Sequence, residues 1–404
     1  MNALFQKLLR RTEAAWRNAP RPWNDEESWR TRRNNVDAIR AILALLVIWF
    51  HGPILLGVDS DSPIAPAFAQ EPLEQIHFVG FRVLCFFWLS GFLLARSWDR
   101  APRVVPFVGR RIARLYPAFL VCAGLCLLVL FAVTPNATLP GWRTVWRYLI
   151  TLRLPEAIGV FPHNDIAHTL NGSLWTLLYE AWCCVALVIL GTFGVLRRGK
   201  PLVVLLCGVW LLYVFQWFGV TPFPLPGESF QTWILFGAAD AYPPLLTCFL
   251  SGVAFHRYRD RIPWHPALFA TSLGGLFLAI SVGVTGPAIP VFGVYCLAYL
   301  AFHPRRLFPN WLSGWGSLSY GIFLYSYPIQ QLWIHYTGDN LTADSLFLVT
   351  IPPVLLLAYL SYRWIENPID RWQKQQNRKR TGGAASAQRA ALPPQLQVGV
   401  RQGP

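Results

Sequence analysis

Two ionisable residues interrupt the first long apolar stretch of this 404-residue chain. Arg40 and His51 lie eleven positions apart among Ala, Ile, Leu, Val, Trp and Phe. An ionisable side chain in a membrane-length apolar segment is costly, and it is retained where it is paired, faces a polar cavity or does chemistry. A histidine exchanges protons near neutral pH, which lysine and arginine do not. We therefore predict that the first helix carries the catalytic base, His51.

A carboxylate, Glu180, is predicted at a similar depth. If segment 37–57 runs outward, His51 lies about 21 Å from its start, in the outer half of a hydrocarbon core about 30 Å thick. Segment 173–195 runs inward, and Glu180 lies about 10 Å below its outer end. A carboxylate beside a histidine fixes its tautomer and stabilises the imidazolium. We predict that Glu180 orients His51. The alternatives are a structural ion pair of Glu180 with an arginine, and a histidine that donates to a backbone carbonyl.

Several arginines gather near the predicted cytoplasmic ends of the helices. Arg110 and Arg114 are four residues apart and share a face if the segment is helical. Together with Arg111 and Arg40, they could hold phosphate groups, because guanidinium groups pair well with phosphate. The alternative is ordinary anchoring to anionic lipid. Asp37, three residues before Arg40, is predicted to have a structural role, as a helix cap and ion-pair partner.

Other polar residues have structural or acceptor-binding interpretations. Ser90, followed by Gly91, is predicted to allow close helix packing. Glu366 is predicted to form a structural ion pair with Arg363. No cluster has the evident ligand set of a metal site, so no metal is expected. The candidates for lining a cavity that binds the substrate acting as acceptor are Trp175, Tyr320, Tyr325 and Ser326.

The elements that must position these residues are membrane helices. The chain is 54% hydrophobic and only 14% charged, whereas soluble domains are nearer a quarter charged. We predict an all-α polytopic protein with a transmembrane domain at 37–370, a basic cytoplasmic segment at 1–36 and a disordered basic cytoplasmic tail at 371–404. The net charge of +15 lies mostly between spans, so a nucleic-acid partner is not expected. The eight cysteines fall in apolar stretches and are predicted to be small buried hydrophobes.

About ten apolar stretches are long enough to be candidate spans. Basic residues are concentrated in every second connector, which places both termini in the cytoplasm. Arg143, Arg147 and Arg153 are the exception, in a long connector placed outside. The predicted spans are 37–57, 76–95, 116–134, 173–195, 201–219, 233–255, 266–284, 287–303, 315–336 and 344–364.

Six segments in order resemble the motifs of the acyltransferase-3 family. They begin with Asp37-Ala-Ile-Arg40 and His51, and they cover about residues 35–370. Two positions depart from the family pattern: Leu84 stands where an acidic residue is common, and Ser326 where many members have a histidine. The six segments are 37–51, 86–92, 107–117, 171–180, 317–328 and 366–368.

The resemblance implies an integral enzyme of the bacterial inner membrane. Such an enzyme moves an acyl group, usually acetyl, from cytoplasmic acyl-CoA to a hydroxyl of a glycan or glycolipid. Acyl-CoA would be a co-substrate, with no tightly bound cofactor. His51 would act as a base or as a transient acyl carrier, and these two routes stay open. The arginines would hold the donor phosphates.

Two other classes of function fit parts of the sequence. A multi-helix transporter or exporter could use His51 and Glu180 as a proton relay. A catalytically inactive relative would fit the departures at Leu84 and Ser326. The acceptor, the acyl chain length and the oligomeric state are not predicted.

Overall fold

The computed structural model describes residues 19–31, 34–57, 80–134, 138–220, 234–373 and 375–376. As predicted, the protein is all-α: the described residues form helices and no strand, apart from an isolated bridge between Thr138 and Ile158. Helices pair their backbone groups internally, which a bilayer requires. The main helices are α2 Glu26–Thr31, α3 Val36–Leu55, α6 Phe81–Arg100, α7 Val104–Val133, α8 Trp142–Ile150, α9 Trp175–Thr192, α10 Val195–Arg198, α11 Lys200–Trp217, α13 Tyr242–Tyr258, α14 Pro266–Ser281, α15 Thr285–Ala288, α16 Val294–Ala301, α17 Asn310–Trp315, α18 Ser319–Thr337 and α19 Ala343–Ser361.

Each of the ten predicted spans overlaps a helix in the described part of the chain, and the predicted span residues 76–79 and 233 lie outside the described residues. Seven helices in the described part of the chain are long and apolar enough to cross a membrane. The stretches Pro266–Ser281 and Thr285–Ala301 are apolar but shorter. α18 is less apolar because it buries polar side chains, among them Gln330 and Gln331. The seven are Val36–Leu55, Phe81–Arg100, Val104–Val133, Gly172–Thr192, Lys200–Trp217, Ile234–Tyr258 and Ala343–Gln373.

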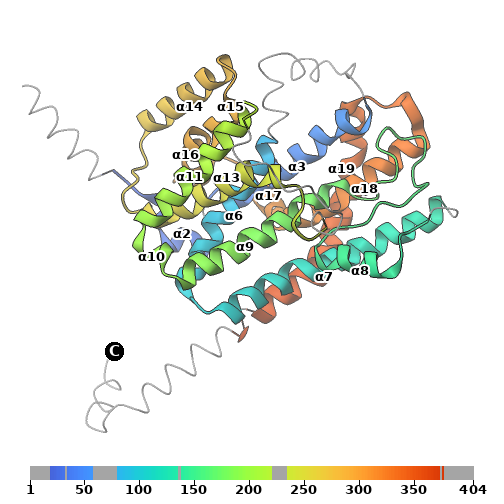
Figure 1. Ribbon diagram of the computed structural model, residues 1–404, viewed down its shortest axis with the longest axis horizontal. Coiled ribbons are helices and arrows are strands. Elements are labelled where there is room, and N and C mark those ends of the chain that lie inside the picture. Colours follow the sequence, from blue (N-terminus) through green and yellow to red (C-terminus); the bar gives the residue numbers. More distant parts are fainter. Residues whose placement is uncertain are drawn as a thin grey trace, which may run out of the picture.

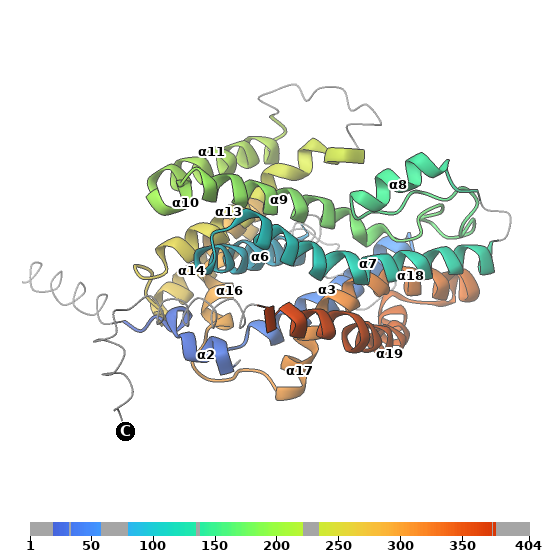
Figure 2. The same ribbon diagram turned by 90° about the horizontal axis from the view of Figure 1, so that it is seen from below.

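The order of helices around the bundle decides which side chains can meet. α6 packs against α3, α9 and α13, and so lies between α3 and α9. On the other side, α3 packs against α18 and α19. Figures 1 and 2 show α7 and α9 running along the long axis of the molecule, with α18 and α19 at the same end as α8.

Glycines allow the closest helix contact, between α6 and α13. A Cβ built on Gly91 would collide with the backbone of Phe249, and one on Gly252 would collide with the backbone of Trp88. Small residues at such positions let two helix backbones approach where lipid offers no competing hydrophobic gain. The Ser90–Gly91 pair therefore does serve helix packing, through its glycine.

The beginning of the described chain packs onto the bundle. The Trp23 ring is buried, and its Nε1 donates to the carbonyl of Arg259 at 2.8 Å. Glu26 pairs with Arg96 and Arg100 at 2.7 and 2.6 Å. Partial burial of Glu26 raises its pKa, but the charges of Arg96 and Arg100 outweigh this and hold it below the ordinary value. Part of the predicted N-terminal segment is therefore attached to the helices.

Helical structure also continues past the predicted boundary at 370. A π-helical turn, Tyr362–Glu366, follows α19, and helix then extends through Gln373. Gln373 Nε2 donates to the carbonyl of Arg110 on α7 at 3.2 Å. We call residues 367–373 the C-terminal extension. The rest of the predicted tail, from 377 on, lies outside the described residues.

The cysteines agree with prediction at seven of eight positions. These seven are buried, and all eight are free thiols. Cys207 differs because it is exposed on α11, a helix that buries little of its surface against the rest of the protein.

Candidate active site

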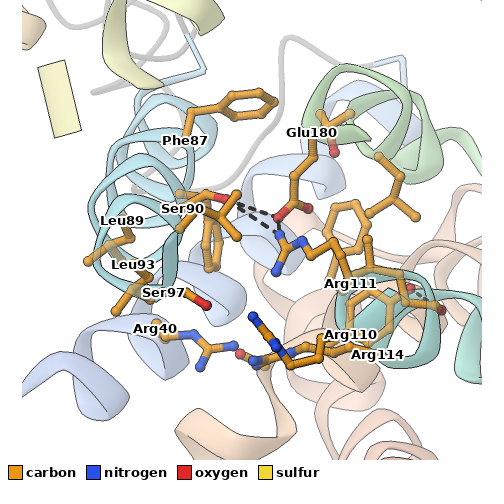
Figure 3. Close-up of a pocket in the computed structure, with 18 of the residues that line it drawn as sticks. Arg40, Phe87, Leu89, Ser90, Leu93, Ser97, Arg110, Arg111, Arg114 and Glu180 are labelled. Atoms are coloured by element: carbon orange, nitrogen blue, oxygen red, sulfur yellow. Dashed lines mark hydrogen bonds and ion pairs between the residues drawn. The ribbon is translucent and has the colours of Figure 1, made fainter. Parts of the chain in front are cut away.

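A cavity of about 300 Å³ lies between α3, α6, α7, α9 and α18 (Figure 3). Its apolar wall comes largely from α6, including Phe86 and Phe87. Cationic, acidic and hydroxyl side chains complete the lining. The polar lining residues are Arg40, Ser90, Ser97, Arg110, Arg111, Arg114, Thr176, Glu180, Ser319, Tyr320, Asp370 and Gln373.

All four arginines that were predicted to bind the donor are part of the lining of this cavity. Figure 3 shows Arg40, Arg110 and Arg114 converging at one end, while Arg111 points toward Glu180. Arg110 and Arg114 share one side of α7 because they are one turn apart. The positive charges of converging guanidinium groups add together, so an anion placed among them is attracted. The geometry supports an anion-binding role for Arg40, Arg110 and Arg114.

Acidic residues partly balance this charge. Asp37 Oδ1 lies 3.8 Å from Arg40 Nη1, so the predicted ion pair is confirmed, but the predicted helix cap is wrong because α3 begins at Val36 and its N-cap residue is Asn35. Asp370, from the C-terminal extension, lines the same cavity. Glu366 lies within electrostatic range of Arg114 and Arg40. The arginine end therefore carries its own carboxylates, which an incoming anion must outcompete.

Glu180 has a different partner from the one predicted. Arg111 Nη2 forms an ion pair with Glu180 Oε1, and Ser90 Oγ donates to the same oxygen at 3.1 Å. The arginine alternative therefore describes the contacts of Glu180. The rise per residue fixes the depth of a side chain but not its position around the bundle. Here α6 lies between α3, which carries His51, and α9, which carries Glu180.

His51 lies near the end of α3, outside the lining of the cavity. Its ring is 5.5 Å from the Tyr327 ring, edge to face. Arg40, Val47 and His51 are nevertheless on one face of α3, because seven and eleven residues each return to within about 20° of the start. Arg40 and Val47 both line the cavity. The cavity face of α3 thus continues to His51, about 6 Å beyond Val47.

The four residues predicted to line an acceptor cavity lie in different parts of the structure. Tyr320 lines the cavity, and its hydroxyl donates to the carbonyl of Leu115 at 2.8 Å. Tyr325 and Ser326 are buried outside the cavity lining, and Ser326 Oγ donates to its own helix. Trp175 is 42% exposed beside Tyr179. Only Tyr320 therefore joins the arginines.

The predicted Glu366–Arg363 ion pair is wrong. Instead, Ser361 Oγ donates to Glu366 Oε1 at 3.3 Å, and no ion pair with Arg363 exists in the described part of the chain. The cause is the π-helical turn at Tyr362–Glu366. Its repeat is wider than that of an α-helix, so residues three apart diverge and residues five apart come together.

Two sequence motifs meet at Asn171. Pro328 lacks the N–H that would bond the carbonyl of Leu324 one turn earlier in α18. Asn171 Nδ2 donates to that carbonyl at 2.8 Å. Asn171 Oδ1 also accepts from the backbone N–H of Ser173, just before α9. Asn171 thereby fixes the start of α9, and with it Glu180, relative to α18.

The sequence analysis did not single out Ser97, Thr176 and Ser319 of the polar lining, and it also missed Asp370 and Gln373. Their spacing from Glu366, four and seven residues, is that of one helical face. That spacing was the available signal, but Asp370 is the last residue of the predicted transmembrane domain and Gln373 falls in the predicted tail.

The fold and the cavity define the class as a polytopic helical membrane protein with an arginine-lined internal site. A family model described as an acyltransferase domain matches residues 33–363. The chain belongs to the acyltransferase-3 family and is an acyltransferase. It is similar to the O-acetyl transferase of Shigella phage Sf6, with 22% identity over 342 residues, 83% of this chain and 95% of that protein. It is also similar to nodulation protein 10 of Rhizobium leguminosarum bv. viciae, with 24% identity over 376 residues, 86% of this chain and 95% of that protein. No solved structure matches the chain.

Proposed function

We propose that the protein is an O-acetyltransferase of the bacterial inner membrane. It takes acetyl groups from cytoplasmic acetyl-CoA and transfers them to a hydroxyl of a cell-surface or lipid-linked glycan. Family membership and the name of the phage relative support acetyl transfer. The observation that carries the proposal is the cavity, in which three converging arginines stand at the start of a face of α3 that leads to His51.

The donor would occupy the cavity lengthwise. Arg40, Arg110 and Arg114 would bind the phosphates of coenzyme A, since guanidinium forks match phosphate oxygens. The thioester arm would pass Val47 and the apolar wall of α6 toward His51. Arg111 is already paired with Glu180, so its role is to hold the wall between α7 and α9. This assignment reduces the predicted set of four phosphate-binding arginines to three.

His51 would act where the thioester meets the acceptor. In one route, its imidazole takes the proton from the acceptor hydroxyl as the oxygen attacks the thioester carbonyl, and the thiolate of coenzyme A leaves and is protonated. In the other route, the imidazole attacks the thioester and takes the acetyl group while the thiolate of coenzyme A leaves and is protonated; the acceptor hydroxyl then attacks the acetyl-imidazole, loses its proton and releases the free histidine. The edge-on contact with Tyr327 would hold the ring in place. Trapping of acetyl-histidine without acceptor distinguishes the two routes.

The test compares His51→Ala with His335→Ala in proteoliposomes supplied with labelled acetyl-CoA and acceptor glycan. Loss of a general acid–base group lowers the rate by about 10²–10⁴. We expect this loss for His51→Ala in both coenzyme A release and acceptor labelling, and near-normal activity for His335→Ala, whose ring contacts Phe161 and Tyr336. Unchanged acetylation by His51→Ala would overturn the proposal. An exporter would release no coenzyme A.

A truncated donor tests the arginines. Arg110→Gln/Arg114→Gln should raise the KM for acetyl-CoA about a hundredfold, since each lost charge-assisted contact costs about 1.5 kcal/mol. The same variant should treat acetyl-pantetheine, which has no phosphate, like the wild type. Equal effects on both donors would show that these arginines do not bind phosphate.

A further inference from the structure

Helix α8 presents two adjacent exposed stripes. Trp142, Trp146 and Ile150 are 68%, 57% and 64% exposed and recur every four residues, so they share a face. Arg143 and Arg147 are also exposed. Each arginine follows a tryptophan, so the basic stripe lies about 100° around the helix from the apolar one. The result is a helix that is apolar on one exposed side and cationic on the next.

The opposite side of α8 is fixed to the protein. Tyr148 is buried, and the Tyr116 hydroxyl of α7 donates to the carbonyl of Ile150. Thr151 Oγ1 donates to the carbonyl of Arg147 at 3.0 Å and closes the end of the helix. Figures 1 and 2 both show α8 beside the second half of α7. With nine residues, about 13 Å, α8 is too short to span a bilayer.

The basic stripe has no acidic partner within the described residues. Neither Arg143 nor Arg147 forms an ion pair there, and Arg143 instead stacks over Trp142 at 5.6 Å. These arginines are the exception to the alternation of basic connectors. With this connector predicted to lie outside, anchoring on the cytoplasmic side does not account for them. A short helix with tryptophans on one face and arginines on the next is typical of helices that lie in a membrane interface.

We propose that α8 binds the phosphate headgroup of an anionic lipid in the leaflet at this end of the protein. Trp142, Trp146 and Ile150 enter the acyl and glycerol region, and Arg143 and Arg147 pair with the phosphate. A soluble phosphate would leave the apolar stripe uncovered, which favours a lipid. The assignment does not depend on the catalytic proposal, because no cavity residue takes part in it.

The test identifies the lipid that lies beside α8. A photoreactive benzoylphenylalanine replaces Trp146, and the protein is reconstituted in vesicles of equal phosphatidylglycerol and phosphatidylcholine with identical acyl chains. The lipids crosslinked after illumination are identified by mass spectrometry. The matched control carries the same group in place of Phe277, which is 65% exposed on α14, a helix without charged residues. The experiment is repeated with Arg143→Gln/Arg147→Gln and with excess soluble glycerol phosphate.

Each basic residue near an anionic surface contributes about a fivefold preference. We expect phosphatidylglycerol to be crosslinked at position 146 about 25-fold more than phosphatidylcholine, and the preference to disappear in the double glutamine variant. Position 277 should show no preference, and its unchanged yield reports intact insertion. The proposal is overturned if positions 146 and 277 give the same lipid ratio, if the variant keeps the preference, or if glycerol phosphate abolishes it.

Discussion

At the scale of single residues, Arg111 and Glu180 form the ionic contact that joins α7 to α9. Their side chains are only 18% and 23% exposed. Glu180→Gln leaves the guanidinium of Arg111 without its counter-charge, and Arg111→Gln does the converse to Glu180. Removing one partner of a fully buried pair costs about 3–5 kcal/mol, so about 2 kcal/mol is expected at this partial burial. The measurement is thermal unfolding in detergent, followed by a thiol-reactive dye that reports the seven buried cysteines.

The double variant Arg111→Gln/Glu180→Gln measures how much the two charges stabilise each other, apart from the effect of changing each residue alone. It removes both charges, so it should lose about 1–2 kcal/mol less than the sum of the single variants. Glu156→Gln, at an exposed position of the connector, serves as the control and should unfold like the wild type. Additive losses would mean that the two charges do not stabilise one another.

The spacing of residues along the sequence predicted contacts within one helix well. It predicted contacts between different helices poorly. Asp37 with Arg40, and Arg110 with Arg114, lie on single helices whose geometry fixes their common face. The partner of Glu180 depends on which helices are neighbours, and the sequence holds no signal for that order. The apolar stretches have the same composition on every side, so depth was predictable and position around the bundle was not.

At the scale of elements, Asn171 joins the start of α9 to the proline-containing middle of α18. Asn171→Ala removes a donor to the carbonyl of Leu324, and about 1 kcal/mol of stability should be lost. Pro328→Ala restores the backbone N–H that this carbonyl lacks. In the Pro328→Ala background, Asn171→Ala should therefore cost clearly less. Equilibrium unfolding of the four proteins in mixed micelles measures both costs.

If Asn171→Ala costs the same in both backgrounds, the carbonyl of Leu324 is not what Asn171 stabilises. Asn340→Ala removes an exposed side-chain bond to the carbonyl of Thr337 at the end of α18. It serves as the control and should show no coupling to Pro328→Ala.

The C-terminal extension contributes a carboxylate to a cavity that is proposed to bind an anion. Asp370→Asn removes that negative charge from among Arg40, Arg110 and Arg114. We expect a several-fold lower KM for acetyl-CoA, with the gain shrinking as salt screens the charges. Steady-state kinetics at low and high ionic strength give the measurement. Donors without phosphate should show no gain.

Asp260→Asn is the matched control for this gain. It changes the net charge equally, but Asp260 is exposed and bonds to Asn24, away from the cavity. A raised KM for Asp370→Asn would mean that the carboxylate helps to hold the donor or the helix. In that case Asp370 would not compete with the donor phosphates.

The long apolar elements were predictable, while two shorter ones were not. The predicted ranges all overlap helices in the described residues, and seven of these helices are of membrane length, because a bilayer permits little else. Helix α8 falls within a predicted connector, since its nine residues alternate basic and apolar side chains too briefly to indicate a span. The last three residues of the C-terminal extension, 371–373, were assigned to the tail because their composition resembles that of the basic segment beyond them.

At the scale of the whole molecule, the two ends of α3 have different chemistry. Arg40 stands near the start of the helix and His51 near its end, about 16 Å apart on one face. The arginine end adjoins the connectors predicted to be cytoplasmic. The end of α3 adjoins the connector that carries α8, because the carboxylate of Asp165 in that connector lies against Gly57. Donor and acceptor are therefore expected to approach from opposite sides of the membrane.

Sealed proteoliposomes test this two-sided access. Acetyl-CoA does not cross a bilayer, so it can be confined to the outside while a soluble acceptor glycan is enclosed or is also left outside. Molecules whose arginine end faces outward should acetylate the enclosed glycan, since the donor enters beside Arg40 and the hydroxyl arrives beside His51. Outside glycan should stay unlabelled until detergent opens the vesicles, after which both arrangements should label equally. Labelling of outside glycan in sealed vesicles would place both substrates on one side, and the path along α3 could not then be the route of transfer.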